Sequence, residues 1–250
     1  MTERVRKIGL ARALSKLGYS SRTQAAELIH AGRVSLNGRM RRDPEAPVNL
    51  KSDHIAVDGK RVAVGQKLYL VLNKPRGLIT TTVDEKGRNT VYSRLPRDLP
   101  WIAPVGRLDK ASEGLLLFTN DSEWAARILA PETHLHKTYH VRVGATVDEA
   151  VLARLMEGIH TAEGDFLAVK DAREVRGGDR RTWVEIVLDE GKNRHIRRMF
   201  EHLGLEVLRL VRIAIGPLTL GDLPKGASRP LTKTEKRALD EAMRARGRSS

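Results

Sequence analysis

The apolar residues of this chain come in short runs, and the order of these runs constrains the fold more than any other feature. The longest runs are of the size of Leu115–Phe118, far short of the roughly 20 apolar residues that a membrane-spanning helix needs. Between residues 68 and 215, runs with strand character outnumber runs with helical periodicity, and the two do not alternate regularly. This order predicts an α+β fold with a mixed, mainly antiparallel sheet and flanking helices, not a doubly wound parallel sheet.

The elements expected in this middle region follow from apolar runs, β-branched residues and turn signals. Gly114–Asn120 is predicted to be a buried strand, and Leu205–Ile215 a long strand with a break near Arg212. Ser122 is the predicted cap of a helix that ends at Leu129, and Thr146 is the predicted cap of a helix at 147–157. The remaining expectations are strands at 68–72, 78–82, 102–105, 137–143 and 182–188, and a helix at 193–203.

The first sixty residues have a different pattern, that of two short helices followed by a small sheet of hairpins. Ile8–Leu17 places its apolar side chains on one helical face, and Ser21 with Gln24 forms the capping-box pattern of a second helix. The dipeptides Asn37-Gly38 and Asp58-Gly59 are typical of tight hairpin turns. The strands expected beside these turns lie at 34–36, 55–57 and 62–64.

Charge is distributed unevenly along the 250 residues. The chain holds 45 lysines and arginines against 31 aspartates and glutamates, so its net charge is +14. Residues 1–64 have a net charge of +7, residues 65–224 of +2 and residues 225–250 of +5. A basic excess of this size indicates a polyanionic partner, and nucleic acid is the simplest one. We therefore expect a basic module, a separate and nearly neutral core, and a basic, disordered tail at 241–250.

Two absences narrow the class of protein. The chain contains no cysteine, which excludes disulfides, a cysteine nucleophile, Fe–S clusters and cysteine-bound zinc. The charged first residues, Met1 to Lys7, are not followed by the apolar segment of a secretory signal. We therefore expect a cytoplasmic protein with no membrane partner.

The runs Ser20–Ile29 and Gly32–Gly38 carry the features of a known module. Together they resemble the S4 RNA-binding domain, and the resemblance covers residues 6–64. In that family the second helix and the turn after it lie on structured RNA. A generic small α+β module with a solvated basic face is the plainer interpretation of the same residues. Cations of this module that are expected to contact phosphates are Arg12, Lys16, Arg22 and Arg33.

A search for catalytic patterns in the middle region leaves one candidate residue. Neither glycine-rich nucleotide-binding motif is present, and the histidines of the segment His134–His140 lack the spacing of a standard metal site, so no metal is predicted. The candidate is Asp109, a carboxylate in a glycine-led turn between the cations Arg107 and Lys110. The two charges are expected to keep it ionised, as a nucleophile requires. On the residues alone, an ordinary turn aspartate before a buried strand explains the same pattern.

Asp109 belongs to one of four segments that follow one another in a recognisable order. Its segment, Gly106–Asp121, begins Gly-Arg-Leu-Asp and continues through Ser112 into a run of leucines. The other segments are a basic turn, a polar strand and the start of a helix, at Asn73–Gly77, Lys137–Tyr139 and Glu190–Met199. In this order they resemble the pseudouridine synthases, in particular the RsuA-like branch that carries an S4 domain. The likeness implies a pseudouridine synthase catalytic domain at 68–240.

The resemblance implies roles for several side chains of this sequence. The central motif puts its essential aspartate at Asp109, and the strand motif puts the tyrosine that lies against the target base at Tyr139. Arg197 is implied to pair with Asp109, and Arg107 to bind the substrate. His195 stands where glutamine is more usual, so a different hydrogen-bonding pattern is expected there. The remaining cations that are expected to contact RNA, or to be solvated, are Lys74, Arg76, Arg194 and Arg198.

The family converts a uridine in RNA to pseudouridine, by breaking the N–C glycosidic bond and reattaching the base through C5. The resemblance therefore implies an isomerase that needs no metal and no organic cofactor. A duplex hides the glycosidic bond, so the uridine must be flipped out, and Tyr139 is expected to stack on it. Whether Asp109 attacks C1′, attacks C6 or removes a ribose proton is left open by the sequence.

The expected partner is ribosomal RNA or a ribosomal assembly intermediate, on which the chain is expected to act as a monomer. Ser112-Glu113 and the strand after Lys137 fit large-subunit members of the family at least as well as small-subunit ones. They favour 23S rRNA as the target, with 16S rRNA as the alternative. A non-catalytic S4 RNA-binding factor associated with the ribosome is a further alternative, but it leaves the motifs of the middle region unexplained.

Overall fold

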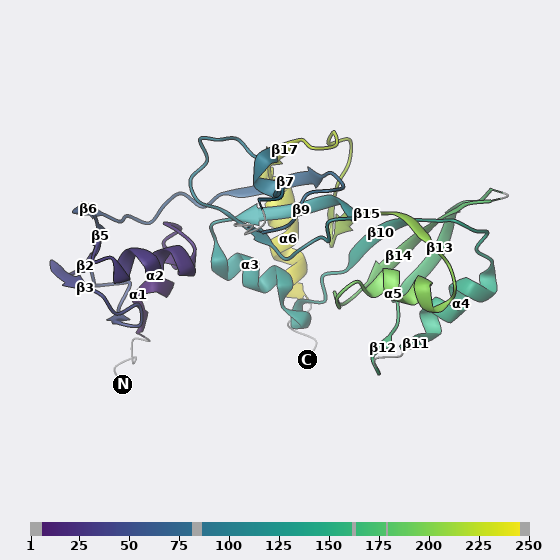
Figure 1. The fold of residues 1–250 in the computed structure, drawn as a ribbon, viewed down its shortest axis with the longest axis horizontal. Coiled ribbons are helices and arrows are strands. Elements are labelled where there is room, and N and C mark those ends of the chain that lie inside the picture. Colours follow the sequence, from purple (N-terminus) through teal and green to yellow (C-terminus); the bar gives the residue numbers. More distant parts are fainter. Residues whose placement is uncertain (1–6, 82–86, 162–163, 179, 246–250) are drawn as a thin grey trace. The chain divides into compact units, whose positions relative to one another are not determined.

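The chain is described here in a computed structural model that covers residues 7–81, 87–161, 164–178 and 180–245 (Figure 1). It divides into two compact units. Among the described residues, the first unit comprises 7–69, 96–103 and 118–126, and the second comprises those of 70–95, 104–117 and 127–245. Within the described ranges, no helix combines the length and the apolar character that crossing a bilayer requires.

The first unit contains the predicted pair of helices. A two-residue strand, β1 (Ile8–Gly9), precedes α1 (Leu10–Lys16), so this helix begins later than predicted. α2 (Arg22–His30) begins with the predicted capping box. The Ser21 hydroxyl accepts a hydrogen bond from the Gln24 amide, and the Gln24 side chain accepts one from the Ser21 amide.

The small sheet of the first unit is antiparallel and is built around the two predicted turns. Its strand order is β3 (Arg39–Arg41), β2 (Val34–Leu36), β5 (Ile55–Val57) and β6 (Lys60–Arg61), while β4 (Pro47–Val48) pairs with β1. The strand predicted at 62–64 is therefore wrong by two residues. The Asp58-Gly59 turn has positive φ at both positions, 49° and 76°, so it reverses the chain within two residues and pairing resumes at once.

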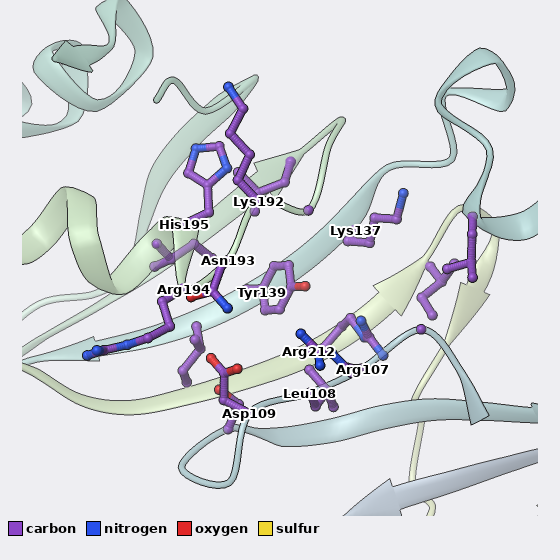
Figure 2. Close-up of a pocket in the computed structure, with 18 of the residues that line it drawn as sticks. Arg107, Leu108, Asp109, Lys137, Tyr139, Lys192, Asn193, Arg194, His195 and Arg212 are labelled. Atoms are coloured by element: carbon purple, nitrogen blue, oxygen red, sulfur yellow. The ribbon is translucent and has the colours of Figure 1, made fainter. Parts of the chain in front are cut away.

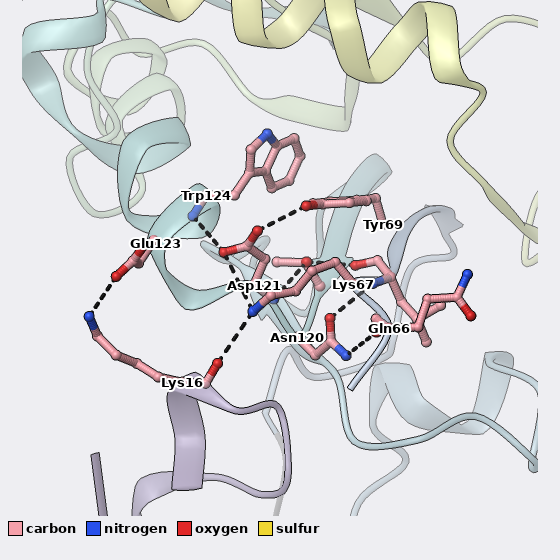
Figure 3. A network of polar contacts seen from close by, with 10 residues as sticks. Lys16, Gln66, Lys67, Tyr69, Asn120, Asp121, Glu123 and Trp124 are labelled. Carbon is pink, nitrogen blue, oxygen red and sulfur yellow. Dashed lines mark hydrogen bonds and ion pairs between the residues drawn. The ribbon is translucent and has the colours of Figure 1, made fainter. Parts of the chain in front are cut away.

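A polar network connects segments of the first unit that are distant in the sequence (Figure 3). The Asn120 side chain accepts a hydrogen bond from the Leu68 amide and donates one to the Gln66 carbonyl, both at 2.9 Å. Lys16 of α1 pairs with Glu123 at 2.5 Å. Because these bonds connect residues more than fifty positions apart, no local sequence pattern indicates them.

The second unit is built on one large mixed sheet. Its strand order is β13 (Asp171–Arg176), β14 (Thr182–Leu188), β10 (Lys137–Val143), β15 (Val207–Ile215), β9 (Glu113–Thr119), β7 (Tyr69–Lys74) and β17 (Ser228–Pro230). β8 (Ala103–Val105) pairs with β9, and β16 (Leu218–Thr219) with β15. β15 runs parallel to β9 and antiparallel to β10, and β10, β14 and β13 are antiparallel neighbours. The predicted α+β fold with a mixed, mainly antiparallel sheet is confirmed.

Two helices cover one face of this sheet. α4 (Glu149–Glu157) and α5 (His195–His202) pack against β10, β13, β14 and β15 (Figure 1). Alternate strand residues such as Val141, Val143 and Val184 point into this core and are fully buried. The other elements are α3 (Ser122–Leu129), α6 (Lys233–Ala245), the short helices η1 (Val91–Arg94) and η2 (Pro131–Thr133), and the hairpin of β11 (Ile159–His160) with β12 (Phe166–Leu167).

Several predictions about this region are wrong in detail. No strand forms in the described part of 78–82, where Ile79 makes only a single bridge with Thr90. The first turn of α3 is capped by the Asp121 carboxylate, not by Ser122, and α4 is capped by Asp148, not by Thr146. The first part of the tail expected at 241–250 is helical, because α6 continues to Ala245, and residues 246–250 lie outside the described residues.

The predicted break in the long strand is present as a register shift. Tyr139 of β10 stands opposite Arg212 of β15, while the preceding Thr138 stands opposite Ala214. Ile213 is the extra residue of this bulge. A β-bulge re-aims the neighbouring side chains, and Arg212 is the side chain next to it.

Candidate active site

The loop Gly106–Ser112, which joins β8 to β9, carries the predicted catalytic aspartate, and a buried lysine supports its backbone. The Lys74 ammonium donates to the backbone carbonyls of Asp109 at 3.0 Å and Ser112 at 2.8 Å. Lys74 has no exposed surface, so its prediction as an RNA contact is wrong. A buried lysine must satisfy its ammonium within the protein, and here it does so by fixing the loop.

The turn after β7 supplies further bonds to the same loop. The Thr80 hydroxyl donates to the Leu108 carbonyl at 2.8 Å, and the Gly77 amide donates to the Lys110 carbonyl at 2.7 Å. Gly106 begins the loop with φ of 73°, a conformation that glycine adopts without strain. The loop is therefore held along its length by hydrogen bonds to its backbone carbonyls, and none of these bonds uses the Asp109 side chain.

Arg197 of α5 contacts the loop at a different point from the predicted one. Its guanidinium donates to the Ala111 carbonyl and to the Val207 carbonyl, both at 3.2 Å. Burial lowers the pKa of Arg197, and the nearby charge of Asp109 acts in the opposite direction. The predicted pairing with Asp109 is thus an electrostatic attraction without an ion-pair contact. Among the residues that the structure describes, the exposed Asp109 carboxylate has no hydrogen-bond or ion-pair partner.

A cavity of about 330 Å³ opens beside the Asp109 carboxylate. Figure 2 shows the carboxylate and the Tyr139 ring facing the same hollow, with Arg107 and Arg212 beside the ring. The cavity is within the range of roughly 300 to 1,000 Å³ that small-molecule sites occupy. The structure therefore brings three predicted site residues, Arg107, Asp109 and Tyr139, to one place.

Arg212 is a cavity residue that the sequence analysis did not select. It is 6% exposed, and its Nε donates to the Leu115 carbonyl at 2.7 Å. Its Nη2 is buried and has no hydrogen-bond partner among the described residues. The only available signal was the predicted break near Arg212 in the long strand Leu205–Ile215. A buried cation with an unused donor beside an open cavity is the arrangement that a polar ligand completes.

The charge around the cavity is mostly positive. Burial lowers the pKa of Lys74 to about 8, and Arg212 contributes to this shift while Asp109 and Glu113 oppose it. Burial and the charge of Arg212 also lower the pKa of Lys137, which lines the cavity. One exposed carboxylate among several cations suits a ligand with phosphate groups on either side of the reacting atoms.

The remaining predictions for α5 fall in different places. Arg194 lies at the rim of the cavity in a left-handed conformation, with φ of 49°, and its side chain extends away from Tyr139 (Figure 2). His195 is buried at the cavity wall, and burial lowers its pKa below the usual 6.5. Arg198 is already paired, because its Nη2 donates to Asp165 at 2.8 Å and to the Thr161 hydroxyl at 3.0 Å.

The cations expected to contact RNA elsewhere are mostly at the surface. Arg12 and Arg22 of the first unit and Arg76 of the second are exposed. Arg33 is also exposed, but it forms a two-pronged pair with Asp58 at 2.9 and 2.5 Å. In the described part of the chain, no group of three or more histidines, aspartates and glutamates could hold a metal ion. The side chains that line the cavity include a carboxylate, a tyrosine and several cations.

Comparison with known proteins gives the family of both parts. The sequence profile described as RNA pseudouridylate synthase matches residues 68–202, and the S4 domain profile matches residues 8–55. An uncharacterised RNA pseudouridine synthase of Aquifex aeolicus is 39% identical over 95% of this chain and 95% of its own length.

Two further relatives carry a more specific name. The ribosomal large subunit pseudouridine synthase B of Bacillus subtilis is 36% identical over 92% of this chain and 94% of its own. The protein of the same name from Escherichia coli K12 is 37% identical over 92% of this chain and 78% of its own. A crystal structure of a pseudouridylate synthase matches the fold with a TM-score of 0.65, at 28% identity, over 93% of this chain and 99% of that one.

Proposed function

This chain belongs to the RNA pseudouridylate synthase family, and from that membership we propose that it isomerises one uridine of large-subunit ribosomal RNA to pseudouridine. The family resemblance predicted from the four ordered motifs is confirmed, as is the S4 domain at the N-terminus. The observation that most supports the ribosomal target is the likeness, over more than nine-tenths of this chain, to relatives named ribosomal large subunit pseudouridine synthase B.

In the proposed reaction one bond of the nucleotide replaces another. The N1–C1′ bond of uridine breaks, the base turns while it is held in the cavity, and a C5–C1′ bond forms. The hydrogen at C5 leaves as a proton, and N1 gains a proton, so atoms and charge balance without an oxidant or a cofactor. What the protein must supply is a place for the flipped nucleotide, a carboxylate at the ribose–base junction and charges that hold both in position.

Asp109 is the group that we assign to the reacting atoms. Its backbone is fixed by Lys74 and its neighbours, while its carboxylate stands open to the cavity without a partner. That combination gives a rigidly placed anion whose lone pairs remain available to attack or to accept a proton. Arg197, bonded to the loop at Ala111, would position the carboxylate and stabilise its charge from behind.

Tyr139 and Arg212 are the residues that we assign to the flipped base. They face each other across β10 and β15, so the tyrosine ring and the guanidinium reach the cavity side by side. The ring offers a stacking surface to the uracil, and the unused Nη2 donor of Arg212 would bind one of its carbonyl oxygens. Arg107 at the cavity wall would bind the adjoining phosphate.

Mapping pseudouridines in ribosomal RNA from a strain that lacks this gene tests the proposal. Carbodiimide modification followed by primer extension stops at each pseudouridine, and we expect one stop in 23S rRNA to disappear. Expression of the wild-type chain should restore it, and expression of the Asp109→Asn variant should not. Loss of a stop in 16S rRNA alone would replace the proposed target with the small subunit. An unchanged pattern in both RNAs would contradict the proposed function.

A further inference from the structure

The sheet of the second unit carries an unusual row of side chains. Arg176 of β13 stands opposite Trp183 of β14, Trp183 stands opposite Arg142 of β10, and Arg142 stands opposite Arg209 of β15. Residues directly opposite each other in antiparallel strands point to the same face of the sheet. These residues therefore form one continuous line across four neighbouring strands, which we call the arginine row (Arg142, Arg176, Trp183 and Arg209).

The arginine row lies on the face of the sheet that the active site does not use. Side chains alternate along a strand, and Tyr139, Val141 and Val143 of β10 point into the core beneath α4 and α5 or toward the cavity. Arg142 therefore points to the opposite face. Arg176 and Arg209 are exposed, and Arg142 and Trp183 are half-buried, so solvent reaches this face.

Part of the charge on this face is not neutralised. Arg209 pairs with Glu113 at 2.9 Å, and Arg173, in the next row, pairs with Glu185 at 2.7 Å. Arg142 and Arg176 have no carboxylate partner among the described residues, and the Nε of Arg142 is buried without any hydrogen-bond partner. A guanidinium whose buried N–H has no hydrogen-bond partner costs free energy, as that of Arg142 does here. A bound polyanion would remove that cost.

Trp183 adds an aromatic surface in the middle of this charge. The Arg209 guanidinium lies 5.9 Å from the centre of the Trp183 ring, which is a cation–π contact. The turn between β13 and β14 contributes two more exposed arginines, Arg180 and Arg181. An aromatic side chain among arginines is the combination with which proteins hold single-stranded nucleic acid without reading its sequence, because the bases stack and the phosphates meet the cations.

We propose that the arginine row, together with Arg180 and Arg181, binds a single-stranded segment of the substrate RNA that lies outside the part held in the active site. The segment must be a flanking one, because the sheet itself separates this face from the cavity beside Asp109. The core as a whole is nearly neutral, with 24 basic and 22 acidic residues between 65 and 224, so this local excess is not a general property of its surface. The inference rests on the proposed function, since it takes RNA as the substrate.

The test compares two charge variants on two RNA probes. Arg142→Gln/Arg176→Gln removes the unpaired cations of the row. Arg154→Gln/Arg237→Gln is the matched control, because it removes two exposed arginines of α4 and α6 that pair with glutamates. The probes are the large-subunit RNA stem–loop that contains the mapped target uridine, and a longer transcript that includes its single-stranded flanks. Thermal unfolding of both variants checks that the fold is retained.

For the longer transcript, we expect the dissociation constant of Arg142→Gln/Arg176→Gln to rise about tenfold. The slope of log affinity against log salt should fall by roughly 1 to 1.5, as the loss of two phosphate contacts to a single strand predicts. The stem–loop should be bound with a change of no more than about twofold, and the control should match the wild type on both probes. Trp183→Leu should weaken binding of the longer transcript by about tenfold, because a stacked base is lost.

Three results would overturn this inference. Affinity and salt dependence like those of the control would show that the row does not contact RNA. An equal loss on both probes would place the contact within the target stem–loop. Unchanged RNA affinity, combined with a loss of co-sedimentation with large-subunit precursor particles, would assign the face to a protein of the assembling subunit. The mapping experiment above is independent of these variants, so failure of the inference and failure of the proposed function can be told apart.

Discussion

At the scale of single residues, the loop Gly106–Ser112 is held through its backbone, and the Asp109 side chain takes no part in holding it. Lys74, Thr80 and Arg197 all bond to backbone carbonyls of the loop Gly106–Ser112, and none of them takes the Asp109 carboxylate as a partner. A carboxylate held in an ion pair is ordered, but its oxygens are already bonded to the partner and are less available to react. Here the order comes from the backbone, and the carboxylate stays available, which is the arrangement that a reacting anion needs.

If Arg212 binds the flipped base, replacing its side chain should weaken recognition of the substrate. Arg212→Met keeps most of the buried volume but removes the Nη2 donor, and we expect kcat/KM for RNA to fall about 10- to 100-fold, as for one charge-assisted hydrogen bond. Because the charge of Arg212 helps to lower the pKa of Lys74, the variant should also raise that pKa. Steady-state kinetics across a pH series measures both effects. A purely structural role for Arg212 would lower the melting temperature without moving the pH profile.

Because the pKa of Lys74 is about 8, we predict that activity falls as the pH rises through this value. Burial lowers its pKa to about 8 from the ordinary 10.5, and deprotonation removes both its charge beside Asp109 and one of its donors. Stability should move in the opposite direction. Because the folded pKa is below the unfolded one, the folded chain binds fewer protons between pH 8 and 10.5, so this group adds stability as the pH rises through that window. A kcat that is constant from pH 7 to 9.5 would contradict this role.

At the scale of elements, one ion pair holds the start of the last helix, α6, against strand β17. Thr232 and Glu235 form a capping box at the start of α6, in which the Thr232 hydroxyl accepts from the Glu235 amide and the Glu235 carboxylate accepts from the Thr232 amide. The same carboxylate pairs with both outer nitrogens of Arg229, the middle residue of β17, at 2.6 and 2.8 Å. The pair therefore connects a sheet edge to the helix that follows it.

Glu235→Gln removes the charge that pairs with Arg229 but keeps a side-chain oxygen that can accept the capping hydrogen bond from the Thr232 amide. The Arg229 guanidinium is the main cause that lowers the pKa of Glu235 to about 2 from the usual 4.5. Since the folded pKa is the lower one, the ionised carboxylate stabilises the fold above pH 4.5, and that contribution is lost as the pH falls from 4.5 to 2. We expect the variant to lose about 1 kcal/mol in the free energy of unfolding at pH 7 and almost nothing at pH 2. Denaturant titrations at both pH values measure this, and an equal loss at both would contradict it.

The elements also show which features a sequence can predict. The α2 capping box and the strands β10 and β14 were predicted correctly, because local hydrogen bonds and strict alternation determine them. The caps of α3 and α4 were misplaced by one and two residues, because aspartate and serine or threonine compete for that position within a few residues. No strand formed in the described part of 78–82 because this segment is a connection that supports the loop Gly106–Ser112, through the bond from Thr80 to the Leu108 carbonyl.

In the candidate active site, too, some residues could be predicted from local motifs, while the surroundings of others depend on residues far away in the sequence. Asp109 and Tyr139, which line the cavity, were selected from the sequence because they lie in recognisable motifs. The buried state of Lys74 depends on carbonyls 35 and 38 residues further along, and the cavity position of Arg212 depends on its pairing with Tyr139. Composition and periodicity do not contain such pairings. A lysine next to a proline turn therefore looked like an RNA contact, although the fold uses it to hold the loop.

At the scale of the whole molecule, the net charge of +14 is distributed unevenly along the chain. The S4 domain and the C-terminal residues hold most of it, and the nearly neutral core conceals both an anion at the cavity and a local excess of arginine on the opposite face of its sheet. A basic average thus describes the class of partner. We propose that the chemistry depends on one anion, the single exposed carboxylate in the loop Gly106–Ser112.

Release of tritium from ribosomal RNA labelled at C5 of uridine tests this claim most directly. Each new C5–C1′ bond displaces the hydrogen at C5 into water, so the wild-type chain should release one tritium for each target site. Asp109→Asn should release none above background, while its dissociation constant for the same RNA stays within a few fold of the wild-type value. Release by Asp109→Asn at a rate comparable to that of the wild type would contradict the account.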